Sequence, residues 1–363
     1  MRKAGAQSNG KAVRAAIAGL GIASTAAAFL LAPAALAEPI QGAGSTFAAP
    51  IIAKWAEAYE LARIDGGDFS SPDWTVDYEP VGSLAGLMRL KQPELDFAAT
   101  DAPVSSDDLE KSGQMQFPII MGGIAVVVNL NGIEPGALRL SGPVLADIYL
   151  GKITAWNDPV IVALNPDLAL PELAIKVLHR QDGSGSTFVF TEFLSATHEE
   201  WKTKFGADTL IAWPVGGGVD GTGNLLRAVE ATSGTIAYAD YGQVLRAELP
   251  FAAIENQAAN FVLPDPKGVA AAAAGVDWAA TSDFYASLTN RPGNDAYPIS
   301  AATFAVVQVT GRDPIRYRRV RDLFRLAFTQ GAADATALGY VPLPQELIDQ
   351  VESYWAVELP GED

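Results

Sequence analysis

The 363-residue chain contains no cysteine and only two histidines. The absence of cysteine excludes disulfides, thiol catalysis, cysteine-ligated metals and lipid attachment to a cysteine after export. Two histidines are too few for a histidine cluster that would hold zinc or a redox metal. Sequences typical of a serine-hydrolase nucleophile elbow, a zinc protease helix and a nucleotide P-loop are also missing. We therefore expect no cofactor, no metal and no enzymatic activity.

The longest hydrophobic run is at residues 15–31, and no similar run follows it. Four positive charges precede it, and it is followed by Ala35-Leu36-Ala37, which has the small residues of a signal-peptidase site. Residues 1–37 are thus predicted to be a secretory signal peptide cleaved after Ala37, which directs the protein to the periplasm. A retained membrane anchor is the alternative, but Gly19, Gly21 and Pro33 interrupt the segment.

Positive charge is scarce, with 25 Lys and Arg against 42 Asp and Glu. Loss of residues 1–37 removes four positive charges and no negative ones, and takes the net charge from −17 to −21. Such a surface repels nucleic acid and anionic membranes, so no nucleic-acid partner is expected. Because exposed charges are screened beyond about 8–10 Å at physiological salt, a closed pocket with local donors can still hold an anion.

Strand-like and helix-like segments alternate along the chain, which predicts an α/β fold. The 326 residues after the signal peptide exceed one ordinary hydrophobic core, so two lobes are expected. A continuous apolar run at residues 117–129 contains Gly122-Gly123 and is interpreted as a buried strand that crosses between the lobes. The predicted boundaries are 38–122 for the first part of lobe 1, 123–250 for lobe 2 and 251–363 for the return to lobe 1.

Residues 180–188, with the sequence R-Q-D-G-S-G-S-T-F, connect a predicted strand to a predicted helix. Glycines allow the backbone to approach a ligand closely, and the amides at a helix start bind anions. Arg180 adds a charged donor fork that Asp182 can hold in place. His179 alternates with Arg180 along the strand and is therefore expected to be structural.

Two further strand-to-helix turns carry serine with glycine. The first includes Ser45 and Thr46, whose helix start leaves the amides of Thr46 and Phe47 free for a ligand, although an ordinary helix cap is an alternative. The second contains Ser83. Asp101 follows a short strand and lies in an anion site or simply in a turn. The glycine-rich residues 216–223 are interpreted as a mobile loop rather than another anion cradle.

Three donor turns, one arginine and one strand-end aspartate together suit a tetrahedral oxyanion. The aspartate favours phosphate over sulfate, because hydrogen phosphate still carries a proton to donate at neutral pH and sulfate does not. An unpaired buried charge costs several kcal/mol, which is enough for strong discrimination.

Six motifs, in the same order along the chain, resemble those of the periplasmic phosphate-binding proteins of ABC-type phosphate uptake systems. They are G-A-G-S-T-F at 42–47, D-F-A-A-T-D-A-P at 96–103, F-P-I-I-M-G-G at 117–123, I-Y-L-G-K-I at 148–153, R-Q-D-G-S-G-S-T-F at 180–188 and L-G-Y-V-P-L-P at 338–344. The resemblance implies a two-lobed, type II-like clamshell with a ligand cleft between the lobes. It further implies a monomer that binds one phosphate and passes it to a permease and ATPase complex in the inner membrane.

The resemblance also implies roles for individual residues. The phosphate-binding set is Thr46, Phe47, Ser83, Asp101, Arg180, Ser184, Gly185 and Ser186, with Asp182 behind Arg180. Two departures from the family pattern occur, because Leu84 and Ala85 replace the usual Ser-Gly and serine replaces threonine at position 186. The competing hypotheses are a secreted phosphoesterase with the same pocket, a binding protein for another oxyanion such as sulfate, and a surface adhesion or sensing role.

Overall fold

The computed structural model describes residues 39–64 and 75–359. The predicted signal peptide and its cleavage site lie outside these ranges. Within them, every helix is too short or too polar to cross a membrane.

The main sheet of the described region is a mixed sheet of eight strands, in the order β2-β1-β3-β11-β4-β8-β6-β7. The strands are β1 (Ile40–Gly44), β2 (Val76–Glu79), β3 (Phe97–Thr100), β4 (Gln114–Val128), β6 (Lys176–Arg180), β7 (Gly217–Val219), β8 (Thr235–Asp240) and β11 (Ser300–Gln308). β1, β2 and β3 are parallel neighbours, and so are β6, β7 and β8. The strands therefore form two parallel groups.

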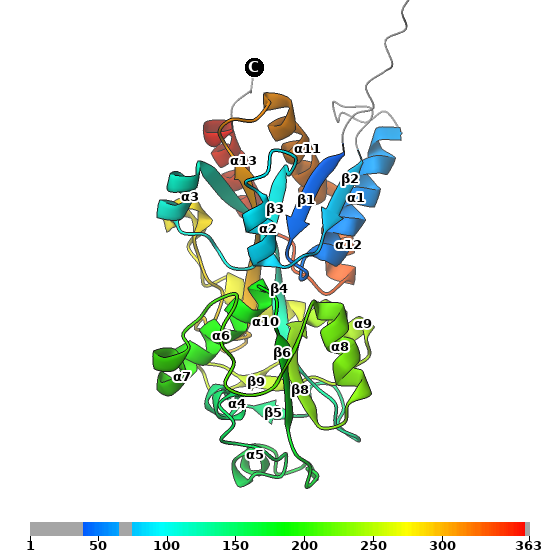
Figure 1. Cartoon of the computed structure of the whole chain (residues 1–363), viewed down its shortest axis with the longest axis vertical. Helices are drawn as coiled ribbons and strands as arrows, with labels where there is room; N and C mark the ends of the chain where they lie inside the picture. The colour runs from blue at the N-terminus through cyan, green and yellow to red at the C-terminus, as the bar shows by residue number, and fades with distance from the viewer. Residues whose placement is uncertain (1–38, 65–74, 360–363) are drawn as a thin grey trace, which may run out of the picture. The chain divides into compact units, whose positions relative to one another are not determined.

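β4 joins the two groups of strands (Figure 1). Its residues from Gln114 to Gly123 pair with β11, whereas those from Ile124 to Val128 pair with β8. The change of partner comes directly after Gly122-Gly123. Another segment of the chain approaches closely there, since a Cβ on Gly123 would lie 2.6 Å from the carbonyl oxygen of Pro264. The predicted buried strand is confirmed, since all but its first residue are buried.

Helices cover both groups of strands (Figure 1). Those near the first group are α1 (Ala49–Ile64), α2 (Ser83–Arg89), α3 (Ser106–Ser112), α11 (Pro314–Gln330), α12 (Ala332–Ala337) and α13 (Gln345–Glu358). The helices between α3 and α11 in the sequence are α4 (Gly142–Tyr149), α5 (Pro159–Leu164), α6 (Gly185–Thr197), α7 (Glu199–Lys204), α8 (Thr222–Ala231), α9 (Tyr241–Arg246) and α10 (Pro266–Ala273). Phe324 packs edge-on against Phe117, and Phe190 stacks on Tyr238; all four belong to one continuous hydrophobic core.

A smaller sheet has the order β10-β9-β5. β9 (Ala253–Glu255) lies between β5 (Arg139–Leu140) and β10 (Phe261–Val262). The segment that follows residue 250 therefore still pairs with residues from the middle of the chain. The lobe boundaries read from the sequence stay predictions.

Residues 216–223 differ from the expected mobile loop. Gly217–Val219 form β7, which pairs in parallel with Leu178–Arg180 of β6. Glycine has no side chain to show the alternation of a strand, so the pattern could not be seen in the sequence. The helix that follows begins at Thr222, inside the residues interpreted as a loop.

Candidate functional site

The candidate residues lie at the carboxyl ends of parallel strands. Ser45 follows β1, Ser83 lies beyond β2, and Asp101 comes directly after β3. Arg180 is the last residue of β6. Ligands of α/β proteins bind at this edge of a sheet, where loops and helix starts converge.

Asp101 is 3% exposed and accepts hydrogen bonds from two hydroxyl groups. Ser45 Oγ donates to Oδ1 at 2.7 Å, and Thr303 Oγ1 donates to the same oxygen at 2.8 Å. Ser45 also lies 2.9 Å from Oδ2. The carboxyl group therefore has a fixed direction, and it is no ordinary exposed turn aspartate.

Burial raises the pKa of Asp101 to about 6. The hydrogen bonds from Ser45 and Thr303 and the positive charge of Arg180 oppose this rise. A carboxyl group with this pKa is mostly ionised at pH 7. It can therefore accept a proton from a ligand.

Arg180 is buried, with a side chain that is 1% exposed. Its Nε donates to Asp182 Oδ1 at 2.6 Å, and its Nη2 contacts Asp182 Oδ2. The predicted support of Arg180 by Asp182 is thus present. Burial would raise the pKa of Asp182, but the hydrogen bonds and charge of Arg180 hold it below the ordinary value.

The other terminal nitrogen of Arg180 contacts two threonines from distant segments. Nη1 donates to Thr46 Oγ1 at 3.0 Å and to Thr222 Oγ1 at 3.1 Å. The two threonine oxygens are themselves 2.9 Å apart. Because Ser45, which holds Asp101, immediately precedes Thr46, the aspartate and the arginine converge on one place.

Ser83 and Gly185 close the site from two helix starts. The Gly185 amide donates to Ser83 Oγ at 3.1 Å. A Cβ on Gly185 would lie 2.5 Å from Asp101 Oδ2 and from Ser83 Oγ. Only glycine fits at this position without displacing them.

Leu84, one of the departures from the family pattern, packs against the loop that carries Arg180. Its amide donates to the carbonyl oxygen of Gly183 at 3.1 Å. Its Cβ would lie 2.4 Å from a Cβ on Gly183. The Leu84 side chain therefore fills the space beside Gly183 and does not lie among the hydrogen-bond donors of the site.

Besides the Gly185 amide, two more of the expected amide donors are engaged within the protein. The Phe47 amide donates to Ser45 Oγ at 3.1 Å, because this hydroxyl caps the turn before α1. The Ser184 amide donates to the carbonyl oxygen of Thr209 at 2.9 Å. The Phe47 amide is therefore not free in this arrangement, and its role as a donor to phosphate stays a prediction. Ser184 Oγ caps α6 by accepting from the Thr187 amide, and Ser186 is 2% exposed in the first turn.

His179 takes a structural position, as its alternation with Arg180 predicts. Its ring stacks on Trp213 with 4.9 Å between centroids. Burial lowers its pKa, so the ring is neutral at pH 7.

Three contact residues escaped prediction. Thr222 accepts a hydrogen bond from Arg180, and Thr303 donates one to Asp101. Gln243 Nε2 donates to the Thr46 carbonyl oxygen at 2.9 Å. Each joins the site across more than 40 positions of sequence. The one available signal was Thr222 at the start of a helix after glycines.

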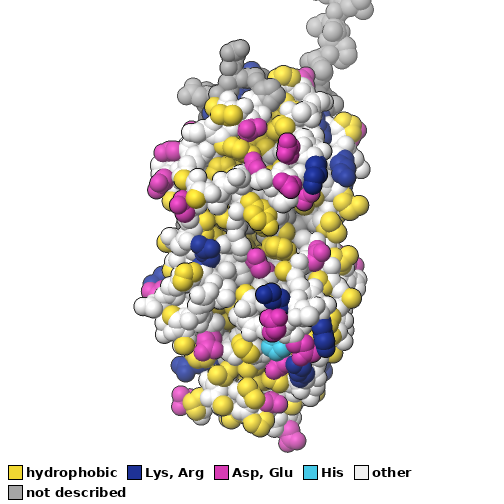
Figure 2. Space-filling view, turned by 90° about the vertical axis from the view of Figure 1, so that its left-hand side faces the viewer, with side chains coloured by type: hydrophobic (Ala, Val, Ile, Leu, Met, Phe, Trp, Pro, Cys, Tyr) yellow, Lys and Arg dark blue, Asp and Glu magenta, His cyan; other side chains and the backbone are white. Residues whose placement is uncertain are grey.

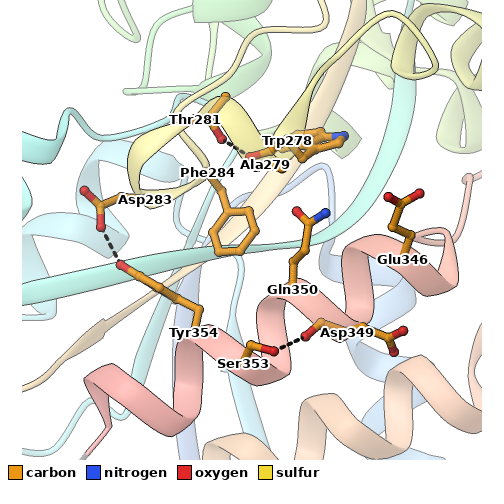
Figure 3. Close-up of a pocket in the computed structure, with 10 residues that line it drawn as sticks. All are labelled: Trp278, Ala279, Thr281, Asp283, Phe284, Glu346, Asp349, Gln350, Ser353 and Tyr354. Atoms are coloured by element: carbon orange, nitrogen blue, oxygen red, sulfur yellow. Dashed lines mark hydrogen bonds between the residues drawn. The ribbon is translucent and has the colours of Figure 1, made fainter.

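Elsewhere, a pocket lies between residues 278–284 and α13 (Figure 3). Asp283, Glu346 and Asp349 line it, and Tyr354 donates to Asp283 at 2.6 Å. Three carboxylates with no lining cation disfavour an anion. Among the described residues, no group of three or more Asp, Glu or His side chains is arranged to hold a metal ion.

Comparison with known proteins gives concordant matches. A family model described as a PBP superfamily domain matches residues 23–324. The phosphate-binding protein PstS of Xylella fastidiosa (strain Temecula1) is 40% identical over 321 residues, which cover 88% of this chain and 85% of that protein.

Solved structures share the fold at low sequence identity. A high-affinity periplasmic phosphate-binding protein, PfluDING, bound with phosphate, has a TM-score of 0.65 and 20% identity and covers 87% of this chain and 93% of its own. A phosphate-binding protein from Stenotrophomonas maltophilia has a TM-score of 0.61 and 17% identity, over 87% of this chain and 94% of its own. The predicted two-lobed α/β fold class is confirmed.

Proposed function

The chain belongs to the PBP superfamily and, within it, to the phosphate-binding proteins PstS, and from this membership we propose that it binds inorganic phosphate for import by an ABC-type permease. One observation carries the choice of ligand. An ionised, buried Asp101 lies beside a buried Arg180 that is already held by Asp182. A bare anion is repelled by the carboxylate, whereas hydrogen phosphate donates its proton to it.

The phosphate contacts follow from the free donors. Arg180 retains one Nη2 hydrogen, since its other four hydrogens point to Asp182, Thr46 and Thr222. The hydroxyl protons of Ser83 and Ser184 are available, because both oxygens only accept hydrogen bonds in the described contacts. Thr46, Phe47, Gly185 and Ser186 complete the proposed set. The amides of Phe47 and Gly185 exchange a hydroxyl partner for the ion when it binds.

Asp101 Oδ2 is the proposed acceptor of the phosphate proton. Oδ1 already accepts two hydroxyl groups, whereas Oδ2 has one at 2.9 Å and faces Gly185. The proton of the ion therefore approaches from the side of α6, whose first turn supplies further donors.

We also propose that the protein acts in the periplasm as a monomeric binding protein and not as an enzyme. The N-terminal sequence supports export, with cleavage after Ala37. The partner that receives the phosphate is the permease and ATPase complex. The first lobe would comprise residues 38–122 and the return segment, and the second lobe would begin at 123. The pairing of β9 with β5 favours a return later than residue 250.

Titration calorimetry tests the ligand. The protein starting at Glu38 is titrated with phosphate, sulfate and arsenate in phosphate-free buffer. Phosphate and arsenate are expected to bind, since they share shape and protonation pattern, and sulfate to bind far more weakly. A preference for sulfate would contradict the role of Asp101. Hydrolysis of a chromogenic phosphomonoester would favour the phosphoesterase instead.

A further inference from the structure

The hydroxyl group of Thr222 lies in the Arg180 cluster without a role in the proposed phosphate contacts. Thr222 is the first residue of α8 and is 3% exposed. Its Oγ1 lies 3.1 Å from Arg180 Nη1 and 2.9 Å from Thr46 Oγ1. Thr46 lies 176 positions earlier in the sequence and is only partly buried.

The protons in this cluster can be counted. Arg180 Nη1 carries two hydrogens and gives one to each threonine oxygen. Each threonine has one proton of its own, and the single contact between the two oxygens uses only one of them. One hydroxyl proton therefore remains, on Thr46 or on Thr222.

Burial decides which threonine keeps its proton free. If Thr46 donated to Thr222, the proton of Thr222 would be buried without an acceptor among the described residues, which costs about 1–3 kcal/mol. If Thr222 donates to Thr46, the free proton belongs to Thr46, which is partly exposed. The second arrangement leaves no buried proton unpaired.

We propose that Thr222 is a positioning residue that donates to Thr46 Oγ1 and thereby directs the Thr46 hydroxyl proton toward the bound ion. Thr46 Oγ1 accepts from Arg180 and from Thr222, so both of its lone pairs are engaged. Its proton then has one remaining direction. Thr222 acts through Thr46 and makes no contact with the ion itself.

A second hydrogen bond fixes the backbone of Thr46. Gln243 Nε2, from α9, donates to the Thr46 carbonyl oxygen at 2.9 Å. Asp240 holds the same side chain through a short contact between Oδ2 and Nε2. The backbone is thus positioned independently of Thr222, which leaves the direction of the hydroxyl proton as the variable that Thr222 controls.

The inference rests on the proposed function and is tested by a double-mutant cycle measured by calorimetry with inorganic phosphate. Thr222→Val removes the hydroxyl and keeps the shape, and we expect about a tenfold loss of affinity, or about 1.4 kcal/mol. Thr222→Ser keeps the hydroxyl and is expected to stay within threefold of wild type. Thr232→Val, at the other end of α8, is the matched control and is expected to change nothing.

Combining Thr222→Val with Thr46→Val tests whether Thr222 acts through Thr46. When Thr46 is already valine, Thr222→Val is expected to cost less than threefold, because the group it positions is gone. Additive losses would overturn the inference, and so would wild-type affinity in Thr222→Val. Thr222→Ala provides a second variant if the valine protein does not fold. Failure of the wild-type protein to bind phosphate would instead contradict the proposed function.

Discussion

Asp101 combines two properties that oppose each other in a folded protein. It is buried, which disfavours its charge, and its proposed role requires it to be ionised so that it can accept a proton from the ligand. Ser45 and Thr303 reduce this conflict by donating to the carboxylate. The selectivity of the site and the stability of the ligand-free protein should therefore depend on the same side chain.

Replacement of Asp101 by asparagine is expected to weaken selectivity more than affinity. The amide group offers a donor where the carboxylate offered only acceptors, so the oxygen of sulfate is no longer repelled. Calorimetric titration with phosphate and with sulfate gives the ratio of the two dissociation constants. The control is Asp96→Asn, which changes a second buried aspartate, at the other end of β3 from Asp101. Equal rejection of sulfate by the variant and the wild type would rule out this role.

The ligand-free protein is expected to lose stability as pH rises from about 4 to 6. The pKa of Asp101 is about 6 when folded, against about 3.9 in an unfolded chain. In this window the folded state binds the proton and the unfolded state has released it. The free energy of unfolding therefore falls as pH rises, by about 3 kcal/mol in total on the basis of this shift.

Urea unfolding of the wild type and of Asp101→Asn at pH 4 and pH 7 measures this effect. The variant should gain stability relative to the wild type between the two pH values, by the same few kcal/mol. Asp240, whose burial raises its pKa to about 7, titrates in both proteins, but the charge of Asp101 adds to that rise, so Asp240 contributes less to the pH dependence of the variant. A pH-independent difference would mean that Asp101 titrates normally.

At the residue scale, the sequence predicted which residues come together better than it predicted the hydrogen bonds that these residues make. Arg180, Asp101, Ser83 and Gly185 meet as expected because each follows a strand or begins a helix. The partners of these residues were not predictable in the same way. Thr303 reaches Asp101 across 202 positions, and that contact depends on which strands become neighbours.

At the scale of elements, each donor turn is one strand followed by one helix. β1 leads to α1, β2 to α2 and β6 to α6, and these connections were visible as changes from alternating to helical spacing. β7 was not visible, since glycine hides the alternation. The strand order was also hidden, because β11 inserts between β3 and β4 from the far end of the chain.

The start of α6 depends on the absence of a side chain at position 185. Gly185→Ala places a methyl group 2.5 Å from Asp101 Oδ2 and Ser83 Oγ, so the helix start must move away from both. We expect phosphate affinity to fall by roughly 100-fold, about the effect of two hydrogen bonds. Calorimetry measures the affinity, and circular dichroism reports whether the helices persist.

Gly223→Ala is the matched control for this change. Gly223 lies in the first turn of α8, and the nearest atom to a Cβ there is Arg227 Nη1 at 3.7 Å, which is an ordinary contact. This variant should bind phosphate as the wild type does. Wild-type affinity in Gly185→Ala would show that the helix start and Asp101 do not face each other.

At the scale of the whole molecule, strong negative charge surrounds a site for an anion. Lysine and arginine are interspersed with acidic side chains on the face shown in Figure 2, so no broad positive surface attracts the ligand there. In the proposed site the attraction comes from Arg180 and helix starts, which act at short range. Binding and approach should therefore respond differently to salt.

Added salt is expected to speed phosphate association and to leave dissociation nearly unchanged. The form that starts at Glu38 carries a net charge of −21, which repels the ion over a Debye length of about 30 Å at 0.01 M salt and about 8 Å at 0.15 M. Screening removes this long-range barrier, while the buried contacts that set the dissociation rate are hardly screened. Stopped-flow measurements over this range should show roughly a twofold or greater rise in the association rate. A fall would mean that the local field of the site already dominates at long range and that the surface charge has little influence on capture.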